Sequence, residues 1–356
     1  MELKLDKSKV YAIALEGGGA KGAYEVGVWQ ALDEVGIQYN AVSGTSVGAL
    51  NGALMTMRDL PRAIRCWNDI RISKVIDMPK EEEGDFKRLL TGALELDDIR
   101  KLIPQAMELI RNRGLDVAPL RAWVREVVDV QKVKESDVAF FISTVSLSDR
   151  KGLEIKVNDL PEDEICDMLL ASAYHPSFRL ERLGGKLYAD GGFVDTLPLH
   201  VLVENGYKDI IAVRIPGLGR ERQFKIPEDV HITTIHTNSD LGHVLNFDAE
   251  QSRRDNRIGY FDALRVLYGL SGRRYTVERT MSEWDCLCWL LDQRTDTTAP
   301  LRDYLEIELP RLARELEAED GGYFALAEAI WERRALEKDV DPFHIYTDRE
   351  LLDALA

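Results

Sequence analysis

The chain has 356 residues, of which 45% are hydrophobic and 30% charged, with a formal net charge of −16. This is the composition of a globular protein with room for one large domain or two modest ones. The excess of acidic residues disfavours nucleic acid as a partner, because phosphate binding relies on a basic surface. It also argues against strong adsorption to anionic membranes, so any contact with a membrane surface is expected to be peripheral and transient.

No apolar run approaches the roughly 20 residues of a membrane-spanning helix. The first ten residues, MELKLDKSKV, lack the apolar segment of a secretory signal, and we therefore predict a cytoplasmic protein. The cysteines form no C-x-x-C pair and have no histidine near them in a zinc-site spacing, so we expect structural thiols, no metal and no cofactor. They are Cys66, Cys166, Cys286 and Cys288.

The first predicted unit has a glycine-rich turn between a strand at 11–15 and a helix at about 21–35. The turn, GGGAKG at 17–22, offers backbone N–H groups at a helix N-terminus, which can bind an anion. It formally matches the dinucleotide fingerprint, but that fingerprint expects an acidic residue at the end of the second strand, where the sequence is Val-Ser-Gly. An oxyanion hole is the favoured interpretation, and a scaffold that binds nucleotides or anions is the alternative.

The second predicted unit has a strand at about 41–43, the turn GTSVG at 44–48 and a helix that starts at Ser46. G-x-S-x-G between a strand and a helix is the nucleophile-elbow pattern, in which the glycines permit a strained turn that exposes the serine hydroxyl. Because the glycine-rich turn lies one unit earlier, it can hold the oxyanion formed when Ser46 attacks an ester. The candidate donors are the backbone N–H groups of Gly17, Gly18, Gly19, Ala20 and Val47.

The rest of the chain predicts a mostly parallel central sheet with helices on both faces. Residues of about 60–130 are expected to form a helical insertion, with a solvated acidic loop at 81–85. Past residue 238 the sequence is helical without strand signals. We therefore predict an acyl-hydrolase domain at 8–238 and a helical region at 239–356 packed on it.

Several further elements are expected inside the first domain. The segment FRLERLGGKLYADGG predicts a hairpin that turns at Gly184-Gly185. The other predictions are strands at 138–147, 210–215 and 232–236, and a helix at 163–173.

A serine nucleophile needs a partner that accepts its proton. None of the six histidines stands in a setting that singles it out. The triplet Asp190-Gly191-Gly192 is the better candidate for this partner, because it follows a predicted strand and its glycines permit close approach of the backbone.

Three motifs in this order, GGGAKG, GTSVG and DGG, resemble those of patatin-like phospholipases. The block ASAYHP at 171–176 is similar to a fourth, and the resemblance covers roughly residues 10–200. It implies a sheet sandwiched by helices, Ser46 as nucleophile and Asp190 as base of a Ser–Asp dyad. It also implies hydrolysis of acyl esters of lipids, as by a phospholipase A or a lysophospholipase. The motif glycines are Gly22, Gly44, Gly48, Gly191 and Gly192.

The chain departs from the family pattern at three positions. Thr196 stands where members often carry Asn, and Tyr174 and His175 stand where small or aliphatic residues are common. We expect Tyr174 to narrow the acyl pocket and His175 to be structural. A narrow pocket would favour the runner-up function, a small-ester or thioester hydrolase with the same mechanism.

Six arginines concentrate positive charge between Arg253 and Arg274 in an otherwise acidic protein. We expect them to pair with acidic residues on helix faces. A site for a phosphate head group or a regulatory anion is the alternative. Head group, chain length and oligomeric state stay open.

Overall fold

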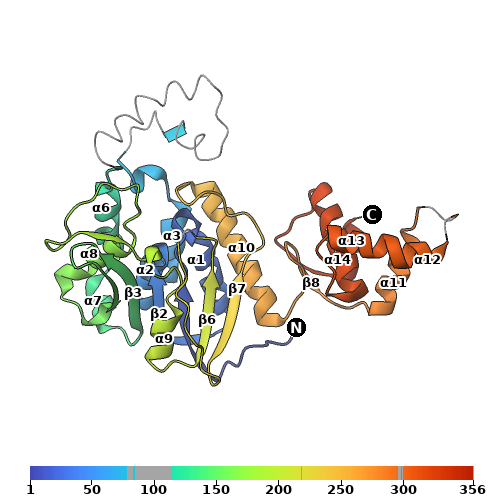
Figure 1. The fold of residues 1–356 in the computed structure, drawn as a ribbon, viewed down its shortest axis with the longest axis horizontal. Coiled ribbons are helices and arrows are strands. Elements are labelled where there is room, and N and C mark those ends of the chain that lie inside the picture. The colour runs from blue at the N-terminus through green and yellow to red at the C-terminus, as the bar shows by residue number, and fades with distance from the viewer. Residues whose placement is uncertain (78–82, 85–113, 218, 296–297, 299, 356) are drawn as a thin grey trace. The chain divides into compact units, whose positions relative to one another are not determined.

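The computed structural model describes residues 1–77, 83–84, 114–217, 219–295, 298 and 300–355 (Figure 1). The chain forms two compact units, Asp6–Ala263 and a second made of Met1–Leu5 and Leu264–Ala356. Helix α10 (Ala249–Tyr268) begins in the first and ends in the second, so the boundary lies later than the predicted residue 238. The assignment of 8–238 as the acyl-hydrolase domain stays a prediction, as does the packing of 239–356 on it.

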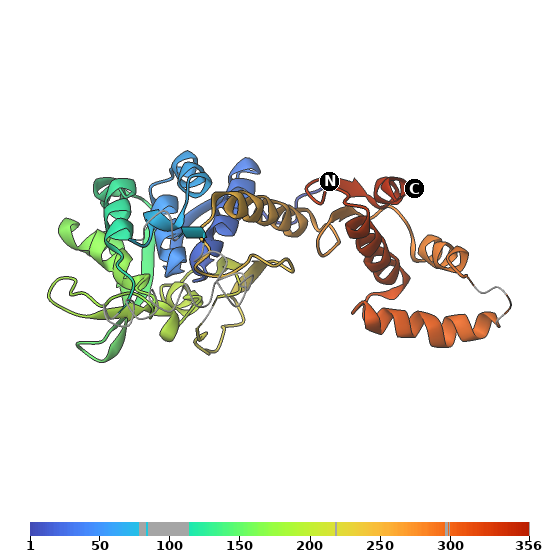
Figure 2. The ribbon, with the colours of Figure 1, turned by 90° about the horizontal axis from the view of Figure 1, so that it is seen from above.

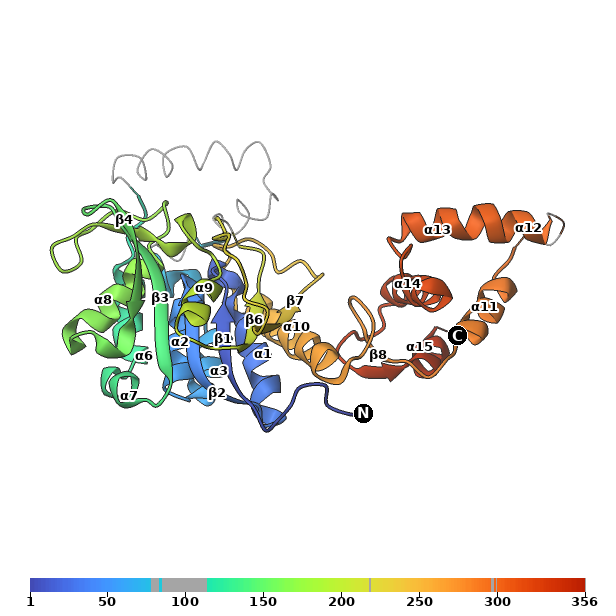
Figure 3. The ribbon, with the colours of Figure 1, turned by 60° about the horizontal axis from the view of Figure 1, so that its bottom comes forward.

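The first unit is built on a seven-stranded sheet with the order β4-β3-β2-β1-β6-β7, in which β5 also pairs with β3 (Figure 3). Neighbours among β1, β2, β3, β6 and β7 are parallel, whereas β4 and β5 run antiparallel to β3. The predicted mostly parallel sheet is thus confirmed. The strands are β1 (Val10–Leu15), β2 (Gln38–Thr45), β3 (Ala139–Ser146), β4 (Lys151–Lys156), β5 (Tyr188–Asp190), β6 (Asp209–Arg214) and β7 (His231–His236).

The predicted hairpin before Asp190 is only partly correct. Its turn exists, with positive φ at Gly184 and Gly185, and an isolated bridge joins Leu183 to Lys186. Its second arm, however, is β5, which pairs with β3. The pairing of β2 with β3 ends at Ser143, so the last residues of β3 have room for another strand on that side. Because β3 pairs with β2 up to Ser143 and with β5 beyond it, the end of β5 lies beside the end of β2.

Helices cover both faces of the sheet. On one face, α2 (Val47–Thr56) packs so closely that a Cβ at Gly52 would lie 2.6 Å from the Phe140 ring. On the other, α9 (Leu199–Glu204) packs against the alanines of β1. The other helices before α10 in the described residues are α1 (Ala23–Glu34), α3 (Leu60–Asn68), α6 (Ala118–Val127), α7 (Val130–Glu135) and α8 (Glu162–Ser172), with short 3₁₀ turns at Gly19–Gly22, Ile72–Lys74, Val157–Asp159 and Gly191–Phe193.

The described ends of the predicted insertion at 60–130 are helical, in α3 and α6. Its central part, and most of the acidic loop predicted at 81–85, lie outside the described residues. Among helices of the described residues, none combines the length and the apolarity that a bilayer-spanning segment requires. Nor do three or more His, Cys, Asp or Glu side chains of this part of the chain gather as metal ligands would.

The second unit, coloured orange to red in Figure 2 apart from its N-terminal residues, is mostly helical. Its core surrounds Trp331, whose ring packs edge-on against Trp289 and Phe324. The predicted helical C-terminal region is confirmed. It also contains two short strands that gave no signal in the sequence, since β8 (Thr276–Glu278) pairs in parallel with β9 (Ile345–Thr347). Three residues are too few to give a strand periodicity in sequence. The helices are α11 (Glu283–Asp292), α12 (Leu301–Asp303), a π-helical turn (Tyr304–Glu308), α13 (Leu309–Glu315), α14 (Gly322–Glu337) and α15 (Asp348–Ala354).

Candidate active site

Ser46 occupies a strained turn between β2 and α2. Its φ is 56° and its ψ −122°, values that a residue with a side chain adopts only at a cost. The flanking glycines make the turn sterically possible. A Cβ at Gly44 would lie 2.2 Å from the carbonyl oxygen of Gly48, and one at Gly48 would lie 2.6 Å from that of Leu15. The predicted elbow geometry is therefore present.

The structure brings the two predicted catalytic residues together although 144 positions separate them. Ser46 Oγ donates a hydrogen bond of 2.7 Å to Oδ2 of Asp190. The other carboxylate oxygen accepts the Gly192 N–H at 2.8 Å, which fixes the carboxylate plane. Gly191 allows this approach, because a Cβ there would lie 2.2 Å from the carbonyl oxygen of Ser143.

The environment of Asp190 makes it a better base than an ordinary aspartate. The residue is only 9% exposed. Burial raises the pKa of its carboxyl from 3.8 to about 6, against the opposing effect of the hydrogen bonds from Gly192 and Ser46. A carboxylate with this pKa is ionised at neutral pH and holds a proton more readily once it has received one.

The glycine-rich turn lies beside Ser46, but not all of its N–H groups can serve a substrate. The Gly17 N–H donates to the carbonyl oxygen of Thr196 at 2.9 Å, and the Ala20 N–H donates to that of Val244 at 2.8 Å. Both residues are therefore removed from the predicted set of oxyanion donors. Within the described residues, no group accepts from the N–H of Gly18, Gly19 or Val47.

Other residues, not singled out by sequence reasoning, support the elbow. The Ser46 N–H donates to Oγ of Ser172 at 3.0 Å, and that hydroxyl donates to the carbonyl oxygen of Ser143 at 2.7 Å. Thr45 Oγ1 donates to the carbonyl oxygen of Asp195 at 2.8 Å, which ties β2 to the segment after the DGG motif. Ser172 stands in the ASAYHP block, so that motif was the available signal for it.

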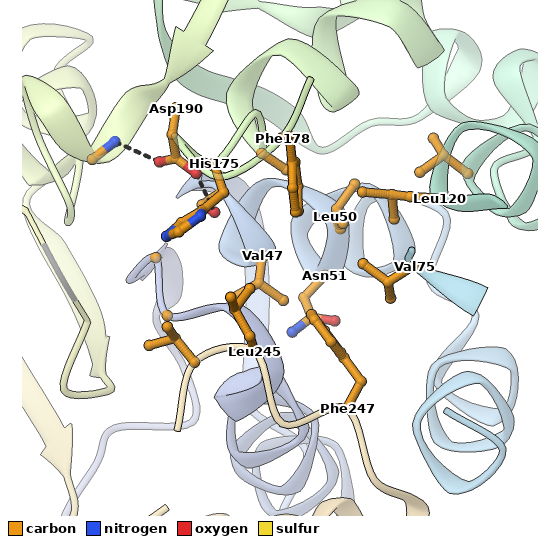
Figure 4. A pocket seen from close by; sticks show the side chains of 18 of the residues that line it. Val47, Leu50, Asn51, Val75, Leu120, His175, Phe178, Asp190, Leu245 and Phe247 are labelled. Atoms are coloured by element: carbon orange, nitrogen blue, oxygen red, sulfur yellow. Dashed lines mark hydrogen bonds between the residues drawn. The ribbon is translucent and has the colours of Figure 1, made fainter. Parts of the chain in front are cut away.

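A cavity of about 280 Å³ adjoins Ser46 and Asp190, both of which line it (Figure 4). Its wall is apolar and comes mainly from α2, α3, α6 and the segment 244–247. Its polar Asn51 is already engaged, since it accepts from Nε1 of Trp67 and donates to Glu25 and to the carbonyl oxygen of Gly22. Representative lining side chains are Leu50, Leu54, Trp67, Leu120, Val124, Phe178 and Phe247.

A family model described as patatin-like phospholipase matches residues 13–203, more than half of the chain. The chain belongs to the patatin-like phospholipase family. The match contains GGGAKG, GTSVG and DGG, the three motifs that meet at the cavity.

Curated relatives share the match at low identity. The chain is 24% identical over 204 residues to "Patatin-like phospholipase domain-containing protein 7" of Rattus norvegicus, which is 57% of this chain and 13% of that protein. It is 25% identical over 206 residues to "Lysophospholipase NTE1" of Mycosarcoma maydis, 58% of this chain and 10% of that protein. The match thus spans only a small part of these relatives.

Among solved structures, VipD from Legionella pneumophila aligns with 97% of this chain and 82% of its own, at 16% identity and a TM-score of 0.37.

Of the departures from the family pattern, Tyr174 does not act as expected. It is 1% exposed and does not line the cavity, and its hydroxyl donates to the carbonyl oxygen of Arg179 at 2.6 Å. The expectation that it narrows the acyl pocket is therefore wrong, because its side chain is held in the protein interior. His175, its neighbour, does line the cavity, as does Thr196.

Three of the six arginines between 253 and 274 have separate contacts. Arg254 lies 3.7 Å from Asp255, as expected. Arg253 instead donates to the carbonyl oxygen of Asn68, and Arg273 pairs with Glu317 at 3.3 Å. Arg253 and Arg273 belong to different compact units. These contacts favour structural roles over a shared anion site.

Proposed function

We propose that the chain hydrolyses carboxylic esters of lipids, with Ser46 as the nucleophile and Asp190 as the general base. The observation that carries this proposal is the 2.7 Å hydrogen bond between Ser46 Oγ and Asp190 Oδ2 in the wall of an apolar cavity. The bond gives the hydroxyl proton a direct acceptor, and the cavity offers the acyl chain a place out of water.

The proposed reaction has two halves. Ser46 Oγ attacks the ester carbonyl carbon while its proton passes to Asp190, and the N–H groups of Gly18, Gly19 and Val47 stabilise the tetrahedral oxyanion. Collapse breaks the bond to the alcohol oxygen, which takes the proton from Asp190. Water, deprotonated by Asp190, then attacks the acyl-enzyme. Collapse of this second intermediate releases the fatty acid, and Asp190 returns the proton to Ser46 Oγ.

The apolar stripe of α2 in the cavity wall supports a substrate with one acyl chain inside the cavity. Val47, Leu50 and Leu54 recur at helical spacing along α2, so Leu54 lies about 10 Å along the helix axis from Val47. An acyl chain attached to Ser46 can follow this stripe. One relative is a lysophospholipase by name, which supports a lipid with a single acyl chain as the substrate.

Graded p-nitrophenyl esters test this function. Each methylene buried in the cavity should add about 0.8 kcal/mol of binding, or about a fourfold gain in kcat/KM, until the cavity is full. We expect kcat/KM to rise from acetate to a medium-length ester and then to level off. Ser46→Ala is the control for background hydrolysis. An optimum at acetate would favour the small-ester alternative, and no turnover at any length would contradict an esterase.

The pH profile tests the base. Since the pKa of Asp190 is about 6 and only the carboxylate can accept a proton, kcat/KM for a neutral ester should be constant above that pH. Below it, kcat/KM should fall tenfold per pH unit. A carboxylate ionises with little enthalpy, so the inflection should barely move with temperature, whereas that of a histidine would shift. An inflection that moves strongly with temperature, or that persists in Asp190→Asn, would rule out Asp190 as the base.

A further inference from the structure

Asp195 lies where the three motif turns meet. Its carbonyl oxygen accepts the hydroxyl of Thr45, the residue before the nucleophile, at 2.8 Å. Its own N–H donates to the Gly191 carbonyl oxygen in the DGG motif at 2.9 Å. The next residue, Thr196, has the carbonyl oxygen that accepts the Gly17 N–H at 2.9 Å. This short segment therefore joins the elbow, the DGG turn and the glycine-rich turn to one another.

The carboxylate of Asp195 has partners on both oxygens. Oδ1 accepts the N–H groups of Leu197 and Arg222, each at 3.2 Å. Oδ2 lies 2.7 Å from Nδ1 of His200, in the first turn of α9. The side chains of His200 and Asp195 are only 1% and 3% exposed, so this ion pair is shielded from water. The buried ring therefore fixes the orientation of the carboxylate.

Both ring nitrogens of His200 face carboxylates. Nε2 contacts Oε1 of Glu154 on β4, and the same oxygen accepts from Nη1 of Arg222 at 2.6 Å. A neutral imidazole has a lone pair on one nitrogen, and here that lone pair would face an anionic oxygen. The imidazolium has two N–H groups, one for each carboxylate, so the geometry favours the charged ring. Burial lowers the pKa of His200, but the hydrogen bonds to Asp195 and Glu154 outweigh it, and the pKa is raised.

We propose that His200 is a positioning residue for the reaction proposed above. It fixes the Asp195 carboxylate, and Asp195 holds Thr45 and with it the elbow that presents Ser46. The proposal rests on the proposed function, since it concerns the same dyad. The φ of Ser46 is 56°, and a strained conformation persists only while its surroundings hold it. His200 does not line the cavity, so it acts on the reaction only through these residues.

Removal of one hydroxyl tests the link between Asp195 and the elbow. Thr45→Val keeps the branched shape of the side chain and loses the hydrogen bond to Asp195. Because a displacement of about 1 Å costs on the order of 100-fold in rate, kcat for the best p-nitrophenyl ester should fall by about 10- to 100-fold. KM should stay within about twofold of wild type, since the cavity wall is unchanged. Thr45→Ser keeps a hydroxyl and should restore most of the loss.

Ser43→Ala is the matched control. Ser43 lies on the same strand as Thr45 and is equally buried, and its hydroxyl donates to the Pro198 carbonyl oxygen at 3.0 Å. Each variant loses one buried hydrogen bond between β2 and the segment after the DGG motif, so both should lower the melting temperature alike. Only Thr45→Val should lower kcat. An equal fall of kcat in the two variants would assign these contacts to stability and overturn the positioning role.

His200→Gln tests the ring itself. The glutamine amide has no charge and cannot serve both carboxylates, so we expect kcat to fall at least about 10-fold, again with KM within about twofold of wild type. Because His200 acts through Asp195, the fall in the double variant with Asp195→Asn should be smaller than the product of the two single falls. An unchanged kcat in His200→Gln, or equal changes in kcat and KM, would overturn the proposal.

Nitrogen-15 NMR of the wild type gives an answer that does not depend on turnover. Both ring nitrogens of His200 should be protonated at pH 7, where an ordinary histidine is mostly neutral. A neutral ring would overturn the proposal. Should His200→Gln not fold, the Thr45 variants and this spectrum decide, because they keep the ion pair. Absence of wild-type turnover would contradict the proposed function itself, whereas an active wild type with unaffected variants would overturn the positioning role alone.

Discussion

Asp190→Asn should lower kcat for ester hydrolysis by on the order of 10⁴-fold, and Ser46→Ala by a similar factor. The Asn side chain keeps the shape of the carboxylate and can still accept from the Gly192 N–H. It cannot take the Ser46 proton, so the nucleophile stays a neutral alcohol. Because the two residues act as one unit, the double variant should be no slower than either single one. Steady-state kinetics on the best p-nitrophenyl ester measure this.

The pH dependence of stability tests whether the fold of the Asp190→Asn variant is intact. The pKa of Asp190 is 3.8 ordinarily and about 6 in the folded chain, so the native state binds the proton more tightly than the unfolded state. The wild type therefore loses stability as the pH rises from below 4 to above 6, by up to about 3 kcal/mol. Asp190→Asn does not titrate, so its melting temperature relative to that of wild type should increase over this interval. A variant that is inactive and also less stable at pH 8 than at pH 4, relative to wild type, would contradict the account.

Gly19→Ala should lower kcat by at least about 100- to 1,000-fold, the cost of losing one oxyanion donor. Gly19 has a φ of +59°, and a Cβ there would lie 2.1 Å from the carbonyl oxygen of Val244. The clash is with backbone, so the glycine-rich turn must move away from the segment 244–247. This movement breaks the hydrogen bond from Ala20 to Val244 and displaces the N–H groups of Gly18 and Gly19. The expected signature is a fall in kcat larger than any change in KM.

Gly36→Ala is the matched control for backbone strain. Gly36 also has a positive φ, +79°, but a Cβ there would meet no atom within 4 Å. This substitution should cost about 1–2 kcal/mol of stability and leave kcat within twofold of wild type. If Gly19→Ala and Gly36→Ala reduce kcat equally, general destabilisation explains both, and the oxyanion role of the turn is wrong.

The core elements and the two glycine-containing turns at the candidate site could be predicted from the sequence. Apolar runs marked β1, β3 and β6, because strands buried on both faces have no polar alternation. Gly44 and Gly48 marked the elbow, because a Cβ at either position would lie only 2.2–2.6 Å from a backbone carbonyl oxygen. Short or exposed elements were not predicted from the sequence. Strand β4 alternates between exposed and half-buried residues at the sheet edge, and β8 and β9 have three residues each.

Which groups at the site remain available depends on contacts between residues that are distant in the chain. Strand β5 pairs with β3 through a contact distant in sequence, and this pairing brings Asp190 to Ser46 and buries its carboxylate. The use of the Gly17 and Ala20 N–H groups by Thr196 and Val244 is equally non-local. Periodicity and motifs report the neighbours of a residue along the chain. Burial, pKa and unpaired donors depend on contacts between residues distant in the chain. The sequence could therefore predict Ser46 and Asp190 as partners, but it could not choose among the candidate oxyanion donors or place His175.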